Sequence, residues 1–495
     1  MTGKSFPENV LIIGSGMGGL STALILSLLG SRITVIEKNL LPGGLMRSYI
    51  RNGVECEVGV HYLGSLDHGQ VLRRLLDFLG VSSKIPVEKM GANGIIDQYI
   101  FEDFVFNLPE GLDVYEKNLQ NAFPKEHRQI NAIMKTVRRN ARKMHTIDFL
   151  FSTQNDLSML EEMKPVGELL TELNCSPGLR AVLGVPCCWI GVPMASCPVF
   201  YHNMVLATYL FSSWRLKCSG SELTNVFSER LESFGGKIIK GDGVEKILVS
   251  SRVVQGVQLK SGSVLKSPVV IGAVHPKVVL NMLPDGAVKP SYRRLISKLK
   301  DTDGMFCVHA KVDAAQRPKI PHNIFKIKTE KNGDIVDLNY YQIRGSRQDG
   351  KNLLTILTSG KSEQWEKWEQ TKTGQRGKGY ITKKKKRAWR LIREAEDTIG
   401  PMPGAALVDA YTPLTIRDWV NSPGGSAYGI LRSYEQLLET SILNRTSVKG
   451  LFLSGQNVMA PGVLGTILGS FATVKLIIGR ERFLKLSGSL ALAQK

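Results

Sequence analysis

The sequence has little of what marks a metal-binding, disulfide-bonded or membrane-spanning protein. Its seven cysteines are an odd number in 495 residues, and the adjacent Cys187 and Cys188 lack both zinc-ligand spacing and matching histidines. No metal site is therefore predicted, and the cysteine usage favours a reducing compartment such as the cytoplasm. Beyond one run near the N-terminus, no apolar stretch predicts a transmembrane helix, because the last one, Val463–Gly479, is broken by hydroxyl side chains and a lysine.

Acidic residues are scarce relative to basic ones, which gives a formal net charge of +20. Three clusters carry much of the excess: Lys125–Lys143, Lys289–Lys300 and Thr371–Arg393, the last with KKKKR at Lys383–Arg387. One such cluster is typical of a solvated helix face. Three together indicate an anionic partner, either a membrane surface contacted peripherally or an acidic acyl carrier protein. No other feature supports a nucleic-acid partner, and none is expected. The sequence does not indicate an oligomeric state.

The longest uncharged run is VLIIGSGMGGLSTALILSLLG, residues Val10–Gly30. By length it fits a signal peptide or a membrane-spanning helix, but Glu8 and Asn9 precede it where a signal peptide has basic residues. The alternative is a buried parallel strand over Val10–Ile13, a glycine turn, and a helix from Met17 to about Leu29.

The glycines of this run favour the strand–turn–helix interpretation. Gly14, Gly16 and Gly19 fit the pattern G-x-G-x-x-G, in which the glycines allow a tight turn, a close approach to a pyrophosphate and close helix packing. A second strand, Ile33–Glu37, ends in an acid at about the distance where a carboxylate binds ribose hydroxyls. Strand, glycines, helix, strand and acid in this order predict dinucleotide binding.

The chain contains no internal repeats and no second G-x-G-x-x-G after a strand. The absence of a separate nicotinamide domain favours one permanently bound dinucleotide, namely FAD. Helical patterns dominate from Gln70 to Trp214, strands recur over Gly243–Ser250, Val253–Leu259 and Val264–Ala273, and a strand–turn–helix pattern closes the chain at Gly450–Ile477.

The fold class predicted is α/β, with a Rossmann-type FAD-binding domain in three segments and an inserted mixed α+β substrate domain. The FAD-binding segments are residues 1–69, 219–288 and 405–495, and the lipid-facing substrate domain comprises 70–218 and 289–404.

With these motifs in place, the sequence resembles the flavin-dependent phytoene desaturase family, most closely its retinol saturase and carotenoid isomerase branch. Four blocks in order carry the resemblance: VLIIGSGMGGLSTA with Glu37 and Gly43-Gly44, EVGVHYLG (57–64), TPLTIRDWVNSPGGSAYGI (412–430) and LFLSGQNVMAPGVLGTILGS (451–470). The chain departs from the family at WRLKCSGSEL (214–223), where relatives often have a glycine-rich stretch, and this concerns the substrate more than the flavin.

The resemblance implies a set of cofactor-binding residues. Gly14, Gly16, Gly18 and Gly19 would cradle the pyrophosphate; Glu37, with Lys38 beside it, would hold the adenosine ribose; Gly43, Gly44 and Arg47 would border the pyrophosphate and ribityl chain; Val244 would contact adenine; Gly455 and Gln456 would meet the ribityl–phosphate region; Val463, Leu464 and Gly465 would present helix N–H groups to the flavin. A positive helix end there would stabilise an anionic reduced flavin.

Few acid–base candidates accompany these motifs. His61 and Tyr62 lie in a block that the resemblance brings close to the flavin, and His61 fits either proton exchange or a plain hydrogen bond to a backbone carbonyl. His202 is the third catalytic candidate, although an apolar helix favours a structural role for it, and His275 fits the end of a strand. The aromatic-rich segment Val185–Trp214 fits plain core or a lipid tunnel, and the resemblance favours the tunnel.

Three functions fit these features. The first is an FAD-dependent oxidoreductase that saturates or desaturates a carbon–carbon double bond of a long polyene or acyl substrate. The second is a cis–trans isomerase of such a bond that uses reduced FAD without net redox change, with an acyl chain on acyl carrier protein among its substrates. The third is a non-catalytic prenyl or lipid carrier with a Rossmann core, which the intact C-terminal flavin block argues against.

Overall fold

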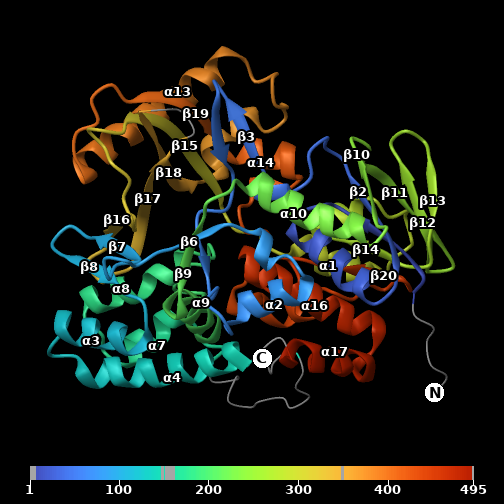
Figure 1. Ribbon diagram of the computed structural model, residues 1–495, viewed down its shortest axis with the longest axis horizontal. Helices are drawn as coiled ribbons and strands as arrows, with labels where there is room; N and C mark the ends of the chain where they lie inside the picture. The colour runs from blue at the N-terminus through green and yellow to red at the C-terminus, as the bar shows by residue number, and fades with distance from the viewer. Residues whose placement is uncertain (1–6, 147–149, 151–161, 347–349, 493–495) are drawn as a thin grey trace.

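A five-stranded parallel sheet forms the right half of the molecule in Figure 1, with the strand order β10-β2-β1-β14-β20. The computed structural model describes residues 7–146, 150, 162–346 and 350–492. The strands of this sheet are β1 (Asn9–Ile13), β2 (Arg32–Glu37), β10 (Lys237–Lys240), β14 (Val270–Gly272) and β20 (Leu451–Leu453). They come from all three segments predicted to form the FAD-binding domain, and the last two are far from β1 in sequence.

Both faces of this sheet are covered, which explains why β1 is a continuous apolar run. Side chains alternate along a strand, so Val10 and Ile12 face one layer while Leu11 and Ile13 face the other. The first layer contains α1 (Met17–Leu28), α2 (Val71–Leu79), α10 (Gly220–Ser233), α16 (Gly462–Ile478) and α17 (Arg480–Leu492). The second contains the antiparallel strands β11 (Val244–Ser250), β12 (Val253–Leu259) and β13 (Val264–Lys266), which lie at the far right of Figure 1.

The single strand expected over Val264–Ala273 is in fact two strands in two different sheets. β13 pairs with β12, whereas β14 pairs with β1 and β20. Between them Pro268 has no N–H to donate, and the hydroxyl of Ser267 accepts the N–H of Val269 at 3.1 Å. The chain therefore turns from one layer to the next at Ser267-Pro268, a change that apolar periodicity does not reveal.

Small hydroxyl side chains join α1 to α16 and to the loop after β20. Ser21 and Ser470 are 2.8 Å apart between hydroxyl oxygens, and Thr22 lies 2.7 Å from Ser454 in the same way. Each of these hydroxyls thus has a hydrogen-bond partner inside the core. Among the polar residues that interrupt Val463–Gly479, Ser470 joins α16 to α1, while Lys475 donates to the carbonyl of Leu150. None of the described helices is long and apolar enough to cross a membrane.

A seven-stranded mixed sheet forms the other half, with the order β19-β15-β18-β17-β16-β7-β8. Its strands are β7 (Asp97–Ile100), β8 (Val105–Leu108), β15 (Gly304–Asp313), β16 (Asn323–Thr329), β17 (Ile335–Gly345), β18 (Lys351–Gly360) and β19 (Ala406–Tyr411). One face packs on α13 (Gly377–Ile399). The other packs on α3 (Leu112–Ala122), α4 (His127–Thr146), α7 (Val166–Glu172), α8 (Pro177–Cys188) and α9 (Val199–Phe211). Figure 1 shows α13 above this sheet and α3, α4 and α7 toward the bottom.

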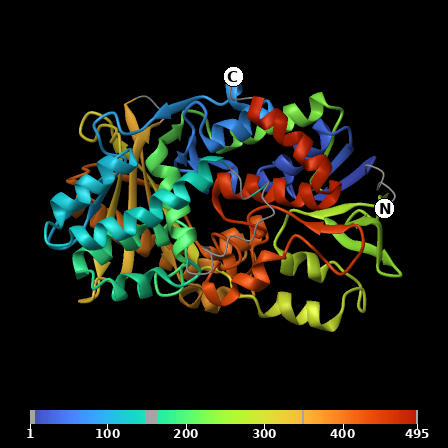
Figure 2. The same ribbon diagram turned by 90° about the horizontal axis from the view of Figure 1, so that it is seen from below.

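Smaller elements connect the two halves. They are the hairpin β3 (Ser48–Arg51) and β4 (Val54–Glu57), the sheet β5 (Leu63–Gly64), β9 (Ser213–Leu216) and β6 (Val87–Lys89), and the helices α11 (Pro276–Asn281), α12 (Pro290–Lys298), α14 (Pro413–Val420) and α15 (Leu437–Ser441). Figure 2 shows the red C-terminal helices and the blue N-terminal segment in the same half of the molecule.

The sheets differ from the sequence-based expectations at two places, and the second of them concerns a predicted domain boundary. The hairpin β7–β8 lies within the region expected to be mainly helical, where β7 pairs in parallel with β16. β19 lies inside the predicted FAD-binding segment 405–495, yet it pairs with β15 in the seven-stranded sheet. Both strands are short and are stabilised by distant partners, so local sequence does not reveal their sheet.

Candidate functional site

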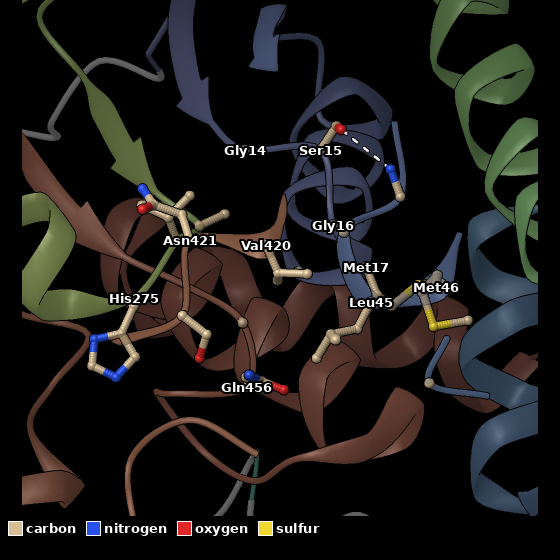
Figure 3. A pocket seen from close by; sticks show the side chains of 18 of the residues that line it. Gly14, Ser15, Gly16, Met17, Leu45, Met46, His275, Val420, Asn421 and Gln456 are labelled. Atoms are coloured by element: carbon tan, nitrogen blue, oxygen red, sulfur yellow. Dashed lines mark hydrogen bonds between the residues drawn. The ribbon is translucent and has the colours of Figure 1, made fainter. Parts of the chain in front are cut away.

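A cavity of about 360 Å³, here called cavity A, lies where β1, β2 and β14 end. Its wall continues through the glycine turn at Gly43-Gly44, the end of α14 and the loop after β20. In an open parallel sheet the carboxyl ends of the strands form the usual ligand crevice. Figure 3 shows Leu45 and Met46 beside Gly16 and Met17, with His275, Asn421 and Gln456 across the space from them.

The N-terminus of α1 faces cavity A without any side-chain cap. Gly16 is the N-cap residue and has no side chain that could accept a capping hydrogen bond, and the first turn contains no acidic residue. The unpaired N–H groups and the positive end of the helix favour a negatively charged ligand. A Cβ added at Gly16 would meet nothing within 4 Å, whereas one at Gly19 would lie 1.9 Å from the carbonyl oxygen of Gly14. Gly16 thus leaves room for a ligand, and Gly19 allows helix–strand packing.

Glu37 at the end of β2 is buried and already holds four donors. Oε2 accepts the backbone N–H and the hydroxyl of Ser15, at 3.1 and 2.6 Å, and Oε1 accepts the backbone and side-chain N–H groups of Asn39, both at 2.8 Å. A carboxylate has about four acceptor positions, so these bonds occupy them all. A ribose diol could bind Glu37 only by replacing one of the two side-chain donors, the hydroxyl of Ser15 or the amide of Asn39.

This arrangement sets the expected result of removing the carboxylate. Glu37→Ala should lower FAD retention, since the ribose loses its acceptor. It should also lower the melting temperature, because four donors lose their partner in a buried place. Flavin absorbance per mole of purified protein and a thermal melt measure the two effects, with Glu8→Ala at the exposed start of the region as control. Full flavin occupancy in Glu37→Ala would show that the ribose contacts other residues.

The last turn of α14 closes the same end of cavity A. Lys38 donates to the carbonyl of Asp418 at 2.8 Å, Asn39 to that of Trp419 at 3.1 Å, and Arg47 to that of Trp419 at 3.3 Å. The Arg47 guanidinium also lies over the Trp419 ring, 5.2 Å from its centroid. Arg47 is not part of the cavity lining, so its influence on a ligand passes through Trp419.

The opposite end of cavity A is formed by the loop after β20 and the start of α16. A Cβ on Gly18 would lie 2.5 Å from the Cα of Gly455, so the two glycines let the first helix touch this loop. The N-terminus of α16 has Pro461 as N-cap, no side-chain capping bond and no acid in its first turn. Its N–H groups at Val463, Leu464 and Gly465 therefore favour partial negative charge on a ligand.

A second cavity of about 570 Å³, here called cavity B, adjoins the first. The aromatic-rich segment predicted as a tunnel wall supplies one side of it, with Cys188, Trp189, Ile190, Phe200, Tyr201, Met204, Val205, Thr208 and Tyr209. The two cavities share Gly59, Val60, His61, Met305, Leu357, Tyr428, Gly462 and Val463. A ligand reaching the α16 end of cavity A would meet a ligand in cavity B at this junction.

His61 is at the junction and is held neutral. Burial, with Arg344 and His309 adding to it, lowers the pKa of His61 to about 3. Its ring lies 5.6 Å from that of Tyr340, and its carbonyl accepts from Gln342 at 3.3 Å. At neutral pH the ring can orient a ligand by a hydrogen bond, but it carries no imidazolium proton to give away.

Tyr62 lines cavity B and connects it to a buried carboxyl group. Its hydroxyl donates to Oδ2 of Asp97 at 3.2 Å, and the amide of Asn323 donates to Oδ1 at 2.7 Å. Asp97 is 0% exposed, and burial raises its pKa to about 7 against the opposing effect of these two hydrogen bonds and of Arg215. A carboxyl group with this pKa is protonated in part at neutral pH, next to a phenol that faces the cavity.

The structure brings most of the predicted cofactor-binding residues to cavity A. Its lining includes Gly14, Gly16, Gly18, Glu37, Lys38, Gly43, Gly44, Val244, Gly455, Gln456 and Val463, while Leu464 and Gly465 line cavity B. Gly19 and Arg47 lie behind the lining. These placements support the assigned roles as proposals.

His202 is the exception among the catalytic candidates. It is buried in α9 outside both linings, where its Nε2 bonds the carbonyl of Leu183 at 2.7 Å and its Nδ1 bonds the side chain of Asn203 at 2.9 Å. Both ring nitrogens are thus used in hydrogen bonds within the core, which favours the structural role of His202.

Several site residues escaped the sequence patterns. Ser15 and Asn39 donate hydrogen bonds to Glu37. Their positions beside the glycine motif and the acid could have indicated this role from the sequence. Asp97 gave none, because it reaches Tyr62 only through the pairing of β7 with β16. His275 was assigned only to the end of a strand, but it caps α11, bonds Asp301 at 2.9 Å and lines cavity A.

Comparison with known proteins agrees with this geometry. The family described as NAD(P)-binding Rossmann-like domain matches residues 12–79. All-trans-retinol 13,14-reductase of Danio rerio is 23% identical over 97% of this chain and 88% of its own length. Prolycopene isomerase 2, chloroplastic, of an Oncidium hybrid cultivar is 23% identical over 94% and 82%. A 4,4'-diapophytoene desaturase (4,4'-diapolycopene-forming) of Methylomonas sp is 21% identical over 71% and 73%.

Among solved structures, an oxidoreductase from Methanosarcina mazei has a TM-score of 0.67 at 14% identity and covers 94% of this chain and 100% of its own. The predicted Rossmann-type α/β fold is confirmed. The relatives confirm the resemblance to the phytoene desaturase-type family near its retinol saturase and carotenoid isomerase branch, and they support FAD as the cofactor and an oxidoreductase or isomerase activity.

Proposed function

We propose that this relative of the retinol saturases and carotenoid isomerases is an FAD-dependent oxidoreductase acting on a carbon–carbon double bond of a long apolar substrate. The observation that carries the proposal is the junction of the two cavities, where the α16 N-terminus, His61 and Tyr428 belong to both linings. Cavity A fits an extended dinucleotide, with Glu37 and Val244 at one end and Val463 at the other. Cavity B has an apolar and aromatic wall that fits a long chain.

The protein's part in the chemistry is to hold FAD and the substrate, to orient them toward each other and to exclude water from the junction. Bound FAD would supply hydride exchange with the substrate at the junction. The start of α16 stabilises negative charge there. Met305 and Leu357 of the seven-stranded sheet form the facing wall and exclude water.

Saturation also needs a proton on the second carbon, and we assign this proton transfer to Tyr62. The phenol faces cavity B and Asp97 lies behind it. When Tyr62 gives its hydroxyl proton to the substrate carbon, protonated Asp97 can return a proton to the phenolate oxygen 3.2 Å away. In the desaturation direction the same groups take the proton up.

The isomerase alternative uses the same cavities and is favoured by the likeness to prolycopene isomerase. The mass of the product separates the two, because saturation adds two hydrogens and isomerisation leaves the mass unchanged. The test of the proposed function begins with the visible spectrum of the purified protein. It continues with anaerobic turnover of a polyene, after dithionite has reduced the bound flavin, and mass spectrometry monitors the product. A protein that stays colourless after incubation with FAD would overturn both readings and leave the lipid carrier.

We further place substrate entry at the rim of cavity B formed by α15. Leu438 lines the cavity and is 75% exposed, and Ile442 next to it is 56% exposed. Exposed apolar residues at a cavity mouth suit delivery of a substrate from a membrane surface.

The basic clusters do not form one membrane-binding surface, since α13 and α4 lie at opposite ends of Figure 1. Each cluster remains a separate candidate for a membrane or an acyl carrier protein. The reducing, cytoplasmic location is likewise a proposal, supported by the free state of all seven cysteines.

A double variant tests this rim. Leu438→Glu with Ile442→Glu should lower cosedimentation with liposomes several-fold, because two apolar anchors are replaced by charges. The control is Ile50→Glu on β3, which is also 75% exposed but lies outside both cavity linings. Equal losses in the rim variant and the control would remove the rim from the entry route.

A further inference from the structure

Arg432 is a buried cation in the wall of the apolar cavity B. It follows the SPGGSAYGI block, is 2% exposed and lines the cavity together with Tyr201, Thr440 and Ser441. Most of the remaining lining is aliphatic or aromatic. Burial lowers the pKa of the guanidinium, but an arginine keeps its charge in a protein.

This charge lacks a counter-charge. Nη1 donates to the carbonyl of Thr440 at 3.2 Å and Nη2 to that of Gln456 at 3.5 Å, while Nε has no hydrogen-bond partner. Among the described residues no carboxylate forms an ion pair with Arg432. By contrast, the buried Arg376 is ion-paired with Asp418. Two neutral carbonyls position a guanidinium but do not neutralise it, and an isolated buried charge is costly.

We propose that Arg432 binds the carboxylate of a long-chain apolar acid whose chain lies in cavity B. The guanidinium lines cavity B, each of its Nη atoms has a second N–H beyond the one given to a carbonyl, and a carboxylate is the anion whose geometry matches such donors. The two carbonyl contacts fix the plane of the guanidinium before the ligand arrives. This inference rests on the proposed function only in taking cavity B as the substrate cavity.

The assignment narrows the substrate class. A carotene hydrocarbon or an alcohol brings no negative charge to Arg432, and an acyl thioester has lost the carboxylate that would pair with it. A free fatty acid or a polyene carboxylic acid supplies both the apolar chain for the aromatic wall and the charge for the guanidinium.

The test compares binding of cis-parinaric acid, a fluorescent polyene acid, with that of its methyl ester. The wild-type protein, as purified with its flavin, should bind the acid about ten- to a hundredfold more tightly than the ester, as a charge-assisted hydrogen bond implies. Arg432→Met should remove the preference while ester binding stays within a few-fold. The control is Lys289→Met, an exposed cation in a basic cluster, which should keep the preference.

Equal binding of acid and ester by the wild-type protein would overturn the proposal, and this comparison needs no variant to fold. Retained preference in Arg432→Met would overturn it too. Arg432→Lys should keep part of the preference through its charge. The readout requires no turnover, so failure of the proposed function would appear separately, as a missing flavin spectrum or a missing product.

Discussion

Replacing Gly16 by alanine is expected to give a folded protein that no longer retains FAD. The backbone of Gly16 has φ −65° and ψ 176°, a conformation that alanine adopts without strain. A Cβ there meets no protein atom within 4 Å, because the space in front of it is cavity A. The methyl group would instead occupy the room that lets a pyrophosphate approach the start of α1. Affinity for FAD should fall at least a hundredfold, while the melting temperature of the flavin-free protein stays unchanged.

Two other glycines complete this experiment. Gly379→Ala, in the exposed first turn of α13, should keep full flavin occupancy and leave the melting temperature unchanged or slightly higher, since alanine favours a helix over glycine. Gly19→Ala should fail differently, by destabilising the fold, because its Cβ would lie 1.9 Å from the carbonyl oxygen of Gly14. Flavin absorbance and thermal melts of the three variants separate a ligand effect from a packing effect. Normal flavin content in Gly16→Ala would show that the pyrophosphate lies elsewhere.

Tyr62→Phe is expected to slow saturation of the double bond by about a hundred- to ten-thousandfold, the usual contribution of general acid catalysis. The phenylalanine keeps the ring that packs on Tyr209, with 4.6 Å between ring centroids, so the shape of cavity B is retained. FAD should remain bound, which places the loss in the chemical step. Tyr209→Phe is the matched control, because it removes a hydroxyl from the same lining that has no hydrogen bond to a carboxylate among the described residues. Similar losses in both variants would point to general disruption of the cavity.

The pH dependence of this step follows from Asp97. Because its pKa is raised to about 7, the proton supply to Tyr62 should decline as pH rises above 7. Asp97→Asn should lower turnover at pH 6 and abolish this inflection. The same shift affects folding: a carboxyl whose pKa is raised from 3.8 in the unfolded chain contributes stability that is complete below about pH 4 and is lost as pH rises through 7. Urea unfolding of wild type and Asp97→Asn at pH 5 and pH 8 measures that difference. Tyr62 and Arg215, which face Asp97, do not titrate in this range.

The local part of the site was predictable from sequence, and the reason is geometric. Gly14, Gly16 and Glu37 lie within one strand–turn–helix–strand unit, so spacing along the chain fixes their spacing in the fold. The apolar pattern of β1 and the small residues of α16 likewise reflect layers that cover them on both sides. For such elements the spacing of apolar residues along the sequence predicts which faces pack against other layers.

The catalytic part was not predictable in the same way. Asp97 reaches Tyr62 through a short strand whose place depends on residues more than 200 positions away in β16. Arg432 follows a glycine-rich block and resembles an ordinary surface arginine until the fold buries it. His202 was a catalytic candidate for which the apolar helix favoured a structural role, and both of its ring nitrogens bond neighbouring groups in the core. Non-local pairing decides these cases.

The contact between Gly18 and Gly455 also sets the order of events during synthesis. The two glycines are separated by most of the chain, yet their backbones touch at the floor of cavity A. A nascent chain that has released only its first βαβ unit has the glycine motif but lacks the loop at 454–457 and the start of α16. Flavin uptake should therefore wait until residues 451–478 have left the ribosome and reached the first βαβ unit.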